Sequence, residues 1–239
     1  MSSERVNALD VLDLTAAYGR IEVLHGVTFS VPKGTVVALL GPNGAGKSTT
    51  LNCIAGLLTP TGGHVHINGH HLNGAAPDRL ARAGLCTIPE GRGIFPNLSV
   101  EENISLFAFA AKAGAKEIEE RSYTHFPRLK ERRTQLAGRL SGGEQQMLAM
   151  ARALSSDPAV LLLDELSMGL APKIVEDLYE IVAEIGRQGV SVLLVEQFAR
   201  RALAVAQLGI VMVQGRVTAL GEPADIEAEL SAAYLGGAA

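Results

Sequence analysis

The sequence predicts an α/β fold with a mixed, mainly parallel β-sheet core, an antiparallel β-rich flank and an inserted helical subdomain. Short aliphatic and β-branched runs recur along the chain with helical patterns between them, as in parallel strands joined by crossover helices. Polar and apolar residues alternate near the start of the chain, which is typical of antiparallel strands. Between about residues 100 and 153 strand signals disappear and helix formers dominate, which predicts the helical subdomain.

Composition narrows the class of protein. The chain has 239 residues, of which 47% are hydrophobic and 19% are charged, so we expect one globular domain over residues 1–239. A net charge of -4 argues against nucleic acid as a partner. Two cysteines make no disulfide framework, which favours a reducing compartment. The apolar runs are shorter than the roughly 20 residues that span a bilayer, and the first residues lack a signal-peptide core.

The individual elements follow from local patterns. Residues 9–15 and 24–31 alternate apolar and polar side chains and predict two antiparallel strands joined by a turn at residues 18–20. Apolar runs predict buried strands at residues 36–40, 160–163, 190–195 and 210–213. A helix is expected over residues 173–187, because its apolar residues fall on one face at helical spacing: Ile174, Leu178, Ile181, Val182 and Ile185.

A phosphate-binding loop follows the predicted strand at residues 36–40. Residues 41–48 read GPNGAGKS, which matches the P-loop pattern of two glycines five apart followed by lysine and a hydroxyl residue. Glycines let backbone N–H groups turn towards phosphate oxygens, and the positive end of the following helix points the same way. Lys47 would hold the β and γ phosphates, and Ser48 would bind Mg²⁺. A glycine-rich turn without a ligand is the alternative, which the strand–loop–helix context disfavours. The predicted nucleotide-binding residues here are Gly41, Pro42, Asn43, Gly44, Ala45, Gly46, Lys47, Ser48 and Thr49.

Two adjacent carboxylates end the strand predicted at residues 160–163. Because side chains alternate along a strand, Asp164 and Glu165 are expected to face different directions and to have different roles. Asp164 would support the magnesium shell, and Glu165 would activate the attacking water as a general base. A solvated turn would carry the same pair, but the P-loop upstream favours catalysis. Together the two motifs predict a nucleoside triphosphatase.

A third motif separates this chain from other P-loop proteins. Residues 140–146 read LSGGEQQ, in which Ser141 and Glu144 form a capping box that opens a helix over residues 145–154. A capped helix start beside Gly142 and Gly143 is also an anion site. The segment resembles the signature of the ABC ATPases, which closes over the γ-phosphate held by the P-loop of a second subunit. The resemblance implies that catalysis requires a dimer.

The resemblance covers essentially the whole chain and extends to weaker motifs. Tyr18 lies where the family places an aromatic ring on adenine, although a packed strand tyrosine would look the same. Residues 167–170 resemble the D-loop at the dimer interface. Glu90 replaces the usual Q-loop glutamine, and we expect it to attract magnesium. Gln197 replaces the usual switch histidine and would donate a hydrogen bond to the γ-phosphate. Leu166 replaces the usual proline, and no functional explanation follows from it.

Five further segments are similar to the LivF-type ATPases, which energise bacterial import of branched-chain amino acids; they are residues 89–92, 95–103, 126–132, 195–197 and 234–237. This resemblance implies an ATP hydrolase that uses ATP and Mg²⁺ and lies peripherally on the cytoplasmic face of the bacterial inner membrane. The implied partners are two transmembrane permease subunits, a second ABC ATPase (a paralogue or the same chain), and indirectly an extracytoplasmic substrate-binding protein.

Other interpretations remain open at this point. The cargo could be urea, another amide or another amino acid, because partner proteins recognise it. A non-transport ABC ATPase usually has two fused nucleotide domains or long coiled coils, which this chain lacks. A P-loop kinase would have no use for the signature segment.

The sequence also contains a histidine group that suggests a metal site: His64, His66, His70 and His71. Residues 68 and 69 read Asn-Gly, which predicts a hairpin between them, and no cysteine or carboxylate joins the group. We therefore expect a surface turn at these histidines. The charged segment over residues 116–133 is interpreted as the solvated face of helices, because acids and bases alternate through it.

Overall fold

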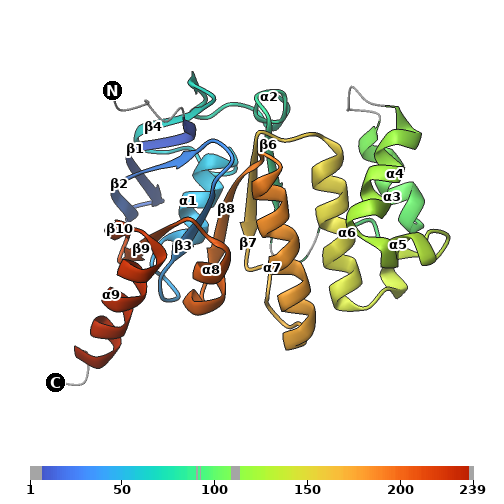
Figure 1. The fold of residues 1–239 in the computed structure, drawn as a ribbon. Helices are drawn as coiled ribbons and strands as arrows, with labels where there is room; N and C mark the ends of the chain where they lie inside the picture. Colours follow the sequence, from blue (N-terminus) through green and yellow to red (C-terminus); the bar gives the residue numbers. More distant parts are fainter. Residues whose placement is uncertain (1–6, 90, 92, 109–113, 237–239) are drawn as a thin grey trace, which may run out of the picture.

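The computed structural model describes residues 7–89, 91, 93–108 and 114–236. The strands form two sheets, drawn in Figure 1. The first has the order β2-β1-β4-β5, formed by β1 (Asn7–Tyr18), β2 (Ile21–Pro32), β4 (Gly62–Ile67) and β5 (His70–His71). The second has the order β10-β9-β3-β8-β7-β6, formed by β3 (Val36–Leu40), β6 (Leu85–Ile88), β7 (Val160–Asp164), β8 (Ser191–Glu196), β9 (Leu208–Val213) and β10 (Arg216–Gly221).

The six-stranded sheet is parallel from β9 to β6, and only β10 pairs antiparallel at its edge. The predicted mixed, mainly parallel sheet is therefore confirmed. Its central strands β3, β7 and β8 are almost wholly buried, which explains why they are mainly apolar in the sequence. Side chains of β3 alternate between two cores, with Val36 and Ala38 in one and Val37 and Leu39 in the other.

The antiparallel flank is also confirmed, since β1 and β2 pair antiparallel over most of their length. One pairing lies beyond the prediction, because β1 also pairs antiparallel with β4, which follows about fifty residues later. Alternation along β1 buries Leu9 and Val11 against the six-stranded sheet. The flank thus closes one face of the core.

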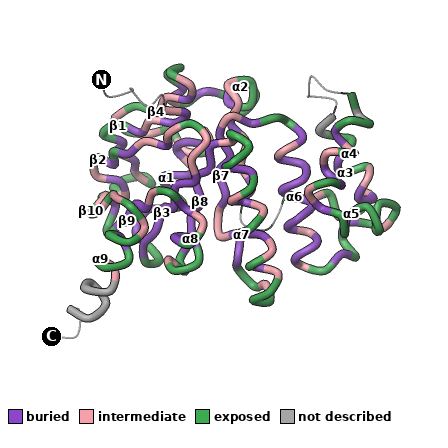
Figure 2. The backbone as a smooth tube through the Cα atoms, in the orientation of Figure 1, coloured by how far each residue is buried: buried purple, intermediate pink, exposed green. Residues whose placement is uncertain are grey.

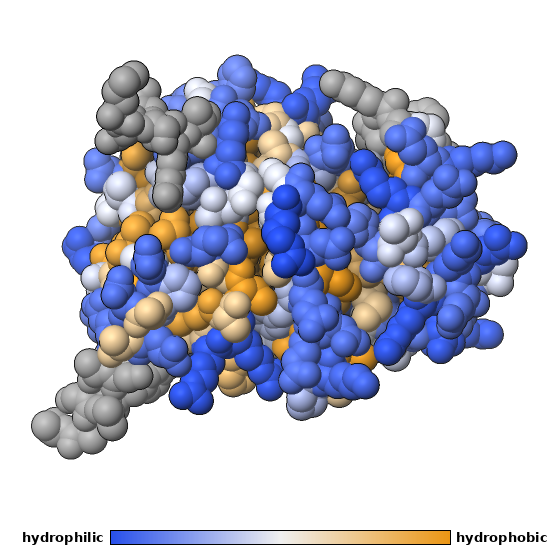
Figure 3. Space-filling view, in the orientation of Figure 1, coloured by the Kyte–Doolittle hydropathy of each residue, from blue (hydrophilic) through white to orange (hydrophobic). Residues whose placement is uncertain are grey.

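Helices cover the rest of the sheet and extend to one side of it. They are α1 (Lys47–Ile54), α2 (Pro77–Arg82), α3 (Val100–Ala108), α4 (Ala115–His125), α5 (Pro127–Glu131), the 3-10 helix η1 (Ala137–Arg139), α6 (Gly142–Ser155), α7 (Pro172–Arg187), α8 (Ala199–Val205) and α9 (Pro223–Gly236). In Figure 1, α3, α4 and α5 gather beyond α6, on the side away from the antiparallel sheet. The outer surface of α4 and α5 is exposed in Figure 2 and hydrophilic in Figure 3. In the described part of the chain, no helix is long and apolar enough to cross a bilayer.

Helix α7 begins one residue before the predicted start and ends at the predicted residue, but its buried face is slightly rotated. Leu178, Val182 and Ile185 are buried as predicted, together with Val175 and Tyr179, whereas Ile174 and Ile181 are only half-buried. Both isoleucines still pack against the core, and Ile174 lies against Gly143 on α6.

The histidines lie at the predicted hairpin between β4 and β5. Asn68 and Gly69 both have positive φ, at 50° and 78°, as a two-residue hairpin turn requires. His64 Nδ1 and His71 Nε2 are 3.2 Å apart. Among the described residues, no group of three or more histidine, cysteine or acidic side chains is arranged to hold a metal ion.

Candidate functional site

The P-loop, the acidic pair and Gln197 lie where three central strands end. In the sheet register Leu40 is opposite Glu196, and Asp164 is opposite Val195, so β3, β8 and β7 end in line. The residues that follow these strands emerge at one edge of the sheet, where ligands bind in open α/β folds. This places the P-loop, Glu165 and Gln197 side by side, although they are far apart in the sequence.

The P-loop passes close to neighbouring backbone and side chains, which explains two of its glycines. A Cβ on Gly41 would lie 2.2 Å from the Met212 carbonyl oxygen, and a Cβ on Gly46, where φ is 100°, would lie 2.8 Å from Leu24 Cδ2. Gly46 is also the N-cap of α1 and has no side chain to occupy the N–H groups of the first turn. The helix starts at Lys47 as predicted, with its positive end facing the loop.

Lys47 is folded back over this loop. Its Nζ donates hydrogen bonds to the carbonyl oxygens of Gly41, at 2.8 Å, and Pro42, at 3.2 Å. Burial lowers the pKa of Lys47, and the nearby carboxylates of Glu165, Asp164 and Glu196 oppose that shift. The Lys47 ammonium group therefore lies close enough to these three acids for their charges to affect its pKa.

The two adjacent acids are separated by a change in backbone conformation. Asp164 is the last residue of β7, and Glu165 follows with a left-handed φ of 47°. The Glu165 N–H donates to the Val195 carbonyl at 3.0 Å, which fixes this conformation. We predicted that strand alternation turns the two side chains apart, but the strand ends at Asp164, so its alternation does not extend to Glu165. Both carboxylates lie close enough to Lys47 to affect its pKa. Left-handed backbone at a residue other than glycine is uncommon and often marks a functional site.

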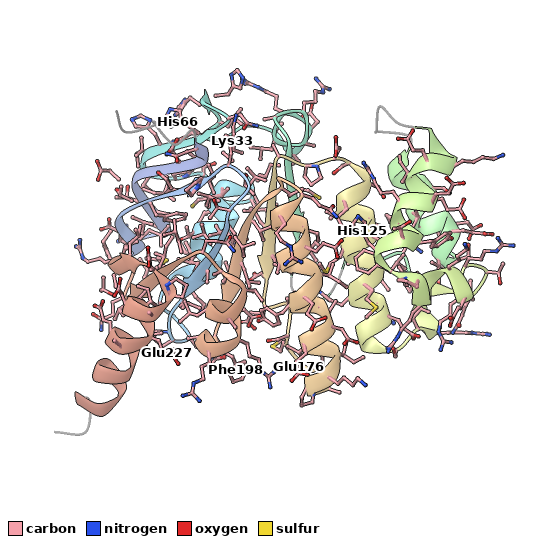
Figure 4. All side chains as sticks on the ribbon, in the orientation of Figure 1. Lys33, His66, His125, Glu176, Phe198 and Glu227 are labelled. Carbon is pink, nitrogen blue, oxygen red and sulfur yellow. The ribbon has the colours of Figure 1, made fainter. Side chains whose placement is uncertain are left out.

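Gln197 lies next to the P-loop. Together with Gly41 and Pro42 it lines an apolar cavity of about 180 Å³, whose other lining residues are Leu40, Ala199, Val211, Val213 and Leu230. The next residue, Phe198, lies at the edge of the molecule in Figure 4 with 61% of its surface exposed. The structure thus places Gln197 beside the P-loop, and its hydrogen bond to the γ-phosphate stays a prediction.

The signature segment forms the start of α6. Ser141 is the N-cap, its N–H and Oγ donate to Glu144 Oε2 at 2.9 and 2.8 Å, and the Glu144 N–H donates to Ser141 Oγ. The predicted capping box is confirmed, but the helix starts at Gly142 instead of Gln145, because a capping box places its glutamate at the third helical position. Burial would raise the pKa of Glu144, but the Ser141 hydrogen bonds and the Arg132 guanidinium, 2.5 Å away, lower it.

This signature segment lies apart from the P-loop of its own chain. In Figure 1, α6 is on the opposite side of β7 and α7 from β3 and α1. Ser141 is exposed. One chain therefore does not bring both anion sites to a single phosphate, which fits the prediction of a second subunit.

The remaining predicted residues have varied positions. Tyr18 ends β1, is half exposed, and accepts a hydrogen bond at 3.5 Å from Asn52 on α1, so its ring lies beside the P-loop helix. Leu166 is 2% exposed and packs in the core below Glu165, which explains an apolar residue there. Glu90 lies outside the described residues. Thr49 is buried in the first turn of α1, and Ser48 is exposed.

Sequence reasoning missed one residue in this site. Glu196 is 1% exposed, ends β8 and accepts hydrogen bonds from Ser167. Its signal in the sequence is a single charged residue that ends an otherwise apolar strand.

Comparisons with known proteins agree with this geometry. The profile of the ABC transporter family matches residues 24–167. The chain is 43% identical over 223 residues to the high-affinity branched-chain amino acid transport ATP-binding protein BraG of Pseudomonas aeruginosa, covering 92% of this chain and 96% of the relative. It is 36% identical over 211 residues to the probable branched-chain amino acid transport ATP-binding protein LivF of Archaeoglobus fulgidus, covering 87% and 89%. A solved structure of an ATP-binding subunit of an ABC transporter superposes with a TM-score of 0.82 at 33% identity, covering 94% of this chain and 93% of that one. The chain therefore belongs to the ABC transporter family, as an ATP-binding subunit.

Proposed function

We propose that this chain hydrolyses ATP to drive the import of branched-chain amino acids through separate membrane subunits. The main support for hydrolysis is that Lys47, Glu165 and Gln197 lie together where the strands of one sheet end. The cargo is supported by the similarity to BraG and LivF over nearly the whole chain.

Nucleotide binding would use the P-loop and its flanking residues. The backbone N–H groups of Gly41 and residues 43–49 and the positive end of α1 would receive the phosphates, and Lys47 would leave its loop carbonyls to contact them. Tyr18, beside α1, would stack on the adenine. The exposed tyrosine and the open phosphate edge suit a ligand that enters from solvent.

Mg²⁺ would be held by Ser48 and Asp164, with Glu90 as a further ligand. One hydroxyl and one or two carboxylates, completed by phosphate oxygens and water, are the donor set that Mg²⁺ prefers in nucleotide sites. Bound magnesium would neutralise phosphate charge.

Glu165 would accept the proton of the attacking water, and Gln197 would donate a hydrogen bond to the γ-phosphate. An amide at position 197 holds its hydrogen-bonding capacity across the physiological pH range, whereas a histidine would titrate.

The signature residues Ser141, Gly142, Gly143 and Glu144 would complete the site of a second ATPase subunit. Their separation from the P-loop of the same chain supports two composite sites in a closed dimer. Closure on ATP would be transmitted to two permease subunits at the cytoplasmic face of the membrane, and an extracytoplasmic substrate-binding protein would deliver the cargo.

Transport by the assembled complex tests this proposal. The permease and ATPase subunits that copurify with the chain would be reconstituted in vesicles, and uptake of labelled leucine, isoleucine and valine would be compared with uptake of urea. We expect ATP-dependent uptake of the three amino acids, abolished by Glu165→Gln. Uptake of urea alone would assign another cargo to the same ATPase. Uptake that persists in the Glu165→Gln complex would contradict the role of Glu165.

A further inference from the structure

Glu196 is a buried carboxylate beside the proposed catalytic residues. It ends β8 on the same face of the sheet as Val192 and Leu194, which pack against the core beneath α7. Only 1% of its surface is exposed. A charged group so deeply buried is expensive unless it is hydrogen-bonded, so its partners identify what it does.

Both carboxylate oxygens accept from one residue on another loop. The Ser167 N–H donates to Glu196 Oε1 at 3.1 Å, and the Ser167 hydroxyl donates to Oε2 at 3.0 Å. Burial and the charge of Glu165 raise the pKa of Glu196, and the Tyr179 hydroxyl and the Ser167 donors oppose that shift. Ser167 is two residues after Glu165 and belongs to the segment that resembles a D-loop.

A second bond ties the same loop to the same strand. The Glu165 N–H donates to the carbonyl of Val195, the neighbour of Glu196. The last two residues of β8 therefore hold both Glu165 and Ser167, and Gln197 follows immediately. The relative position of the proposed base and the proposed γ-phosphate donor depends on this junction.

We propose that Glu196 is a positioning residue for ATP hydrolysis, which holds the segment of residues 165–167 against the end of β8. The proposal rests on the proposed hydrolysis at Glu165. Displacement of a catalytic group by about 1 Å can lower a rate by roughly a hundredfold, so a bidentate bond at this junction would have a large effect on turnover. Nucleotide affinity depends on the P-loop and would change little.

Three substitutions separate positioning from general stability. In Glu196→Gln the amide oxygen can still accept from the Ser167 N–H, and the amide NH₂ can donate to the Ser167 hydroxyl oxygen. We therefore expect kcat to stay within about threefold of the wild type. Glu196→Ala removes both bonds, and Ser167→Ala removes one of them. We expect kcat to fall by roughly tenfold or more in Glu196→Ala and by less in Ser167→Ala, with KM for ATP changed by less than about twofold.

Ser191→Ala is the matched control. Ser191 is also buried, at the other end of β8, and its hydroxyl accepts from the Gly34 N–H at 3.1 Å. The Ser191→Ala variant should lose about as much free energy of unfolding as Ser167→Ala and should keep the wild-type kcat. Equal kcat values for Ser167→Ala, Glu196→Ala and the wild type would overturn the proposal, and so would a Glu196→Gln variant as slow as Glu196→Ala.

Amide hydrogen exchange of the peptide over residues 165–170 provides a readout that does not need hydrolysis. We expect faster exchange in Glu196→Ala than in the wild type and in Ser191→Ala. If the wild type with its partner subunits shows no ATP hydrolysis, the proposed function fails. The hydrogen-exchange rates still show whether Glu196 holds residues 165–167 against the end of β8. An unchanged exchange rate of this peptide in Glu196→Ala would refute the proposed positioning role of Glu196, whatever the ATPase activity.

Discussion

A single added methyl group on the signature segment tests the packing of α6 against α7. A Cβ on Gly143 would lie 2.3 Å from Ile174 Cγ2, and 3.4 and 3.5 Å from Ile174 Cβ and Cγ1. Carbon atoms in contact are about 3.5–4.0 Å apart, so Gly143→Ala requires a displacement of more than about 1 Å. Overpacking of this kind costs about 1–3 kcal/mol. Helix propensity alone would favour alanine by about 1 kcal/mol. The sign of the change in the free energy of unfolding therefore shows whether the clash with Ile174 outweighs helix propensity.

Denaturant unfolding measures the free energy of unfolding of Gly143→Ala, and we expect a net loss. Nucleotide affinity at the P-loop should stay unchanged, because that loop lies beyond α7. ATP-dependent association should weaken, because Ser141 and the first turn of α6 must move. Ile174→Ala removes the obstructing methyl group, so Gly143→Ala should be neutral or stabilising in that background, with a coupling of about 0.5–3 kcal/mol. A stable Gly143→Ala single variant, or additive effects in the double variant, would refute this reasoning.

Three further predictions concern the nucleotide site. Lys47→Ala should weaken ATP binding by roughly 10- to 100-fold in equilibrium dialysis, as expected for the loss of a charge-assisted phosphate contact, and unchanged affinity would contradict the role of Lys47. Tyr18→Ala should weaken ATP binding by about 1–3 kcal/mol while Tyr18→Phe, which keeps the ring, should not; equal losses would count against stacking. The folded pKa of Glu196 is raised, so its contribution to stability is complete below the unfolded pKa and is lost as pH rises through the folded value. The unfolding free energy of the wild type relative to Glu196→Gln should therefore be greater near about pH 5 than near about pH 8, and a constant difference would contradict the buried environment.

Much of the fold could be predicted because buried parallel strands carry strong local signals. The strand at residues 36–40 was predicted to the residue, since it is entirely apolar and ends at a glycine. The β1–β4 pairing was not predicted, because it joins segments separated by about fifty residues and no local pattern encodes it. The start of α6 was placed too late because glycine has low helix propensity, while the capping box sets the true start at Gly142.

The site was predictable to the extent that its residues follow strands. The P-loop spacing encodes a local structure, and the register of β3, β7 and β8 then brings Glu165 and Gln197 to it. The Glu196–Ser167 bond could not be predicted, because it depends on the path of a loop across a neighbouring strand. The Gly143–Ile174 contact could not be predicted from the sequence either, since the two residues meet only through helix packing.

In the proposed mechanism, two ATPase subunits close over ATP, and each completes the site of the other. Light scattering on a Glu165→Gln variant, with ATP and without magnesium, tests it directly, because blocked hydrolysis should trap the closed state. We expect a dimer that forms only with ATP, either from this chain alone or after the second ATPase subunit is added. A monomer that persists with ATP in both mixtures would contradict the composite site and the role of the signature segment.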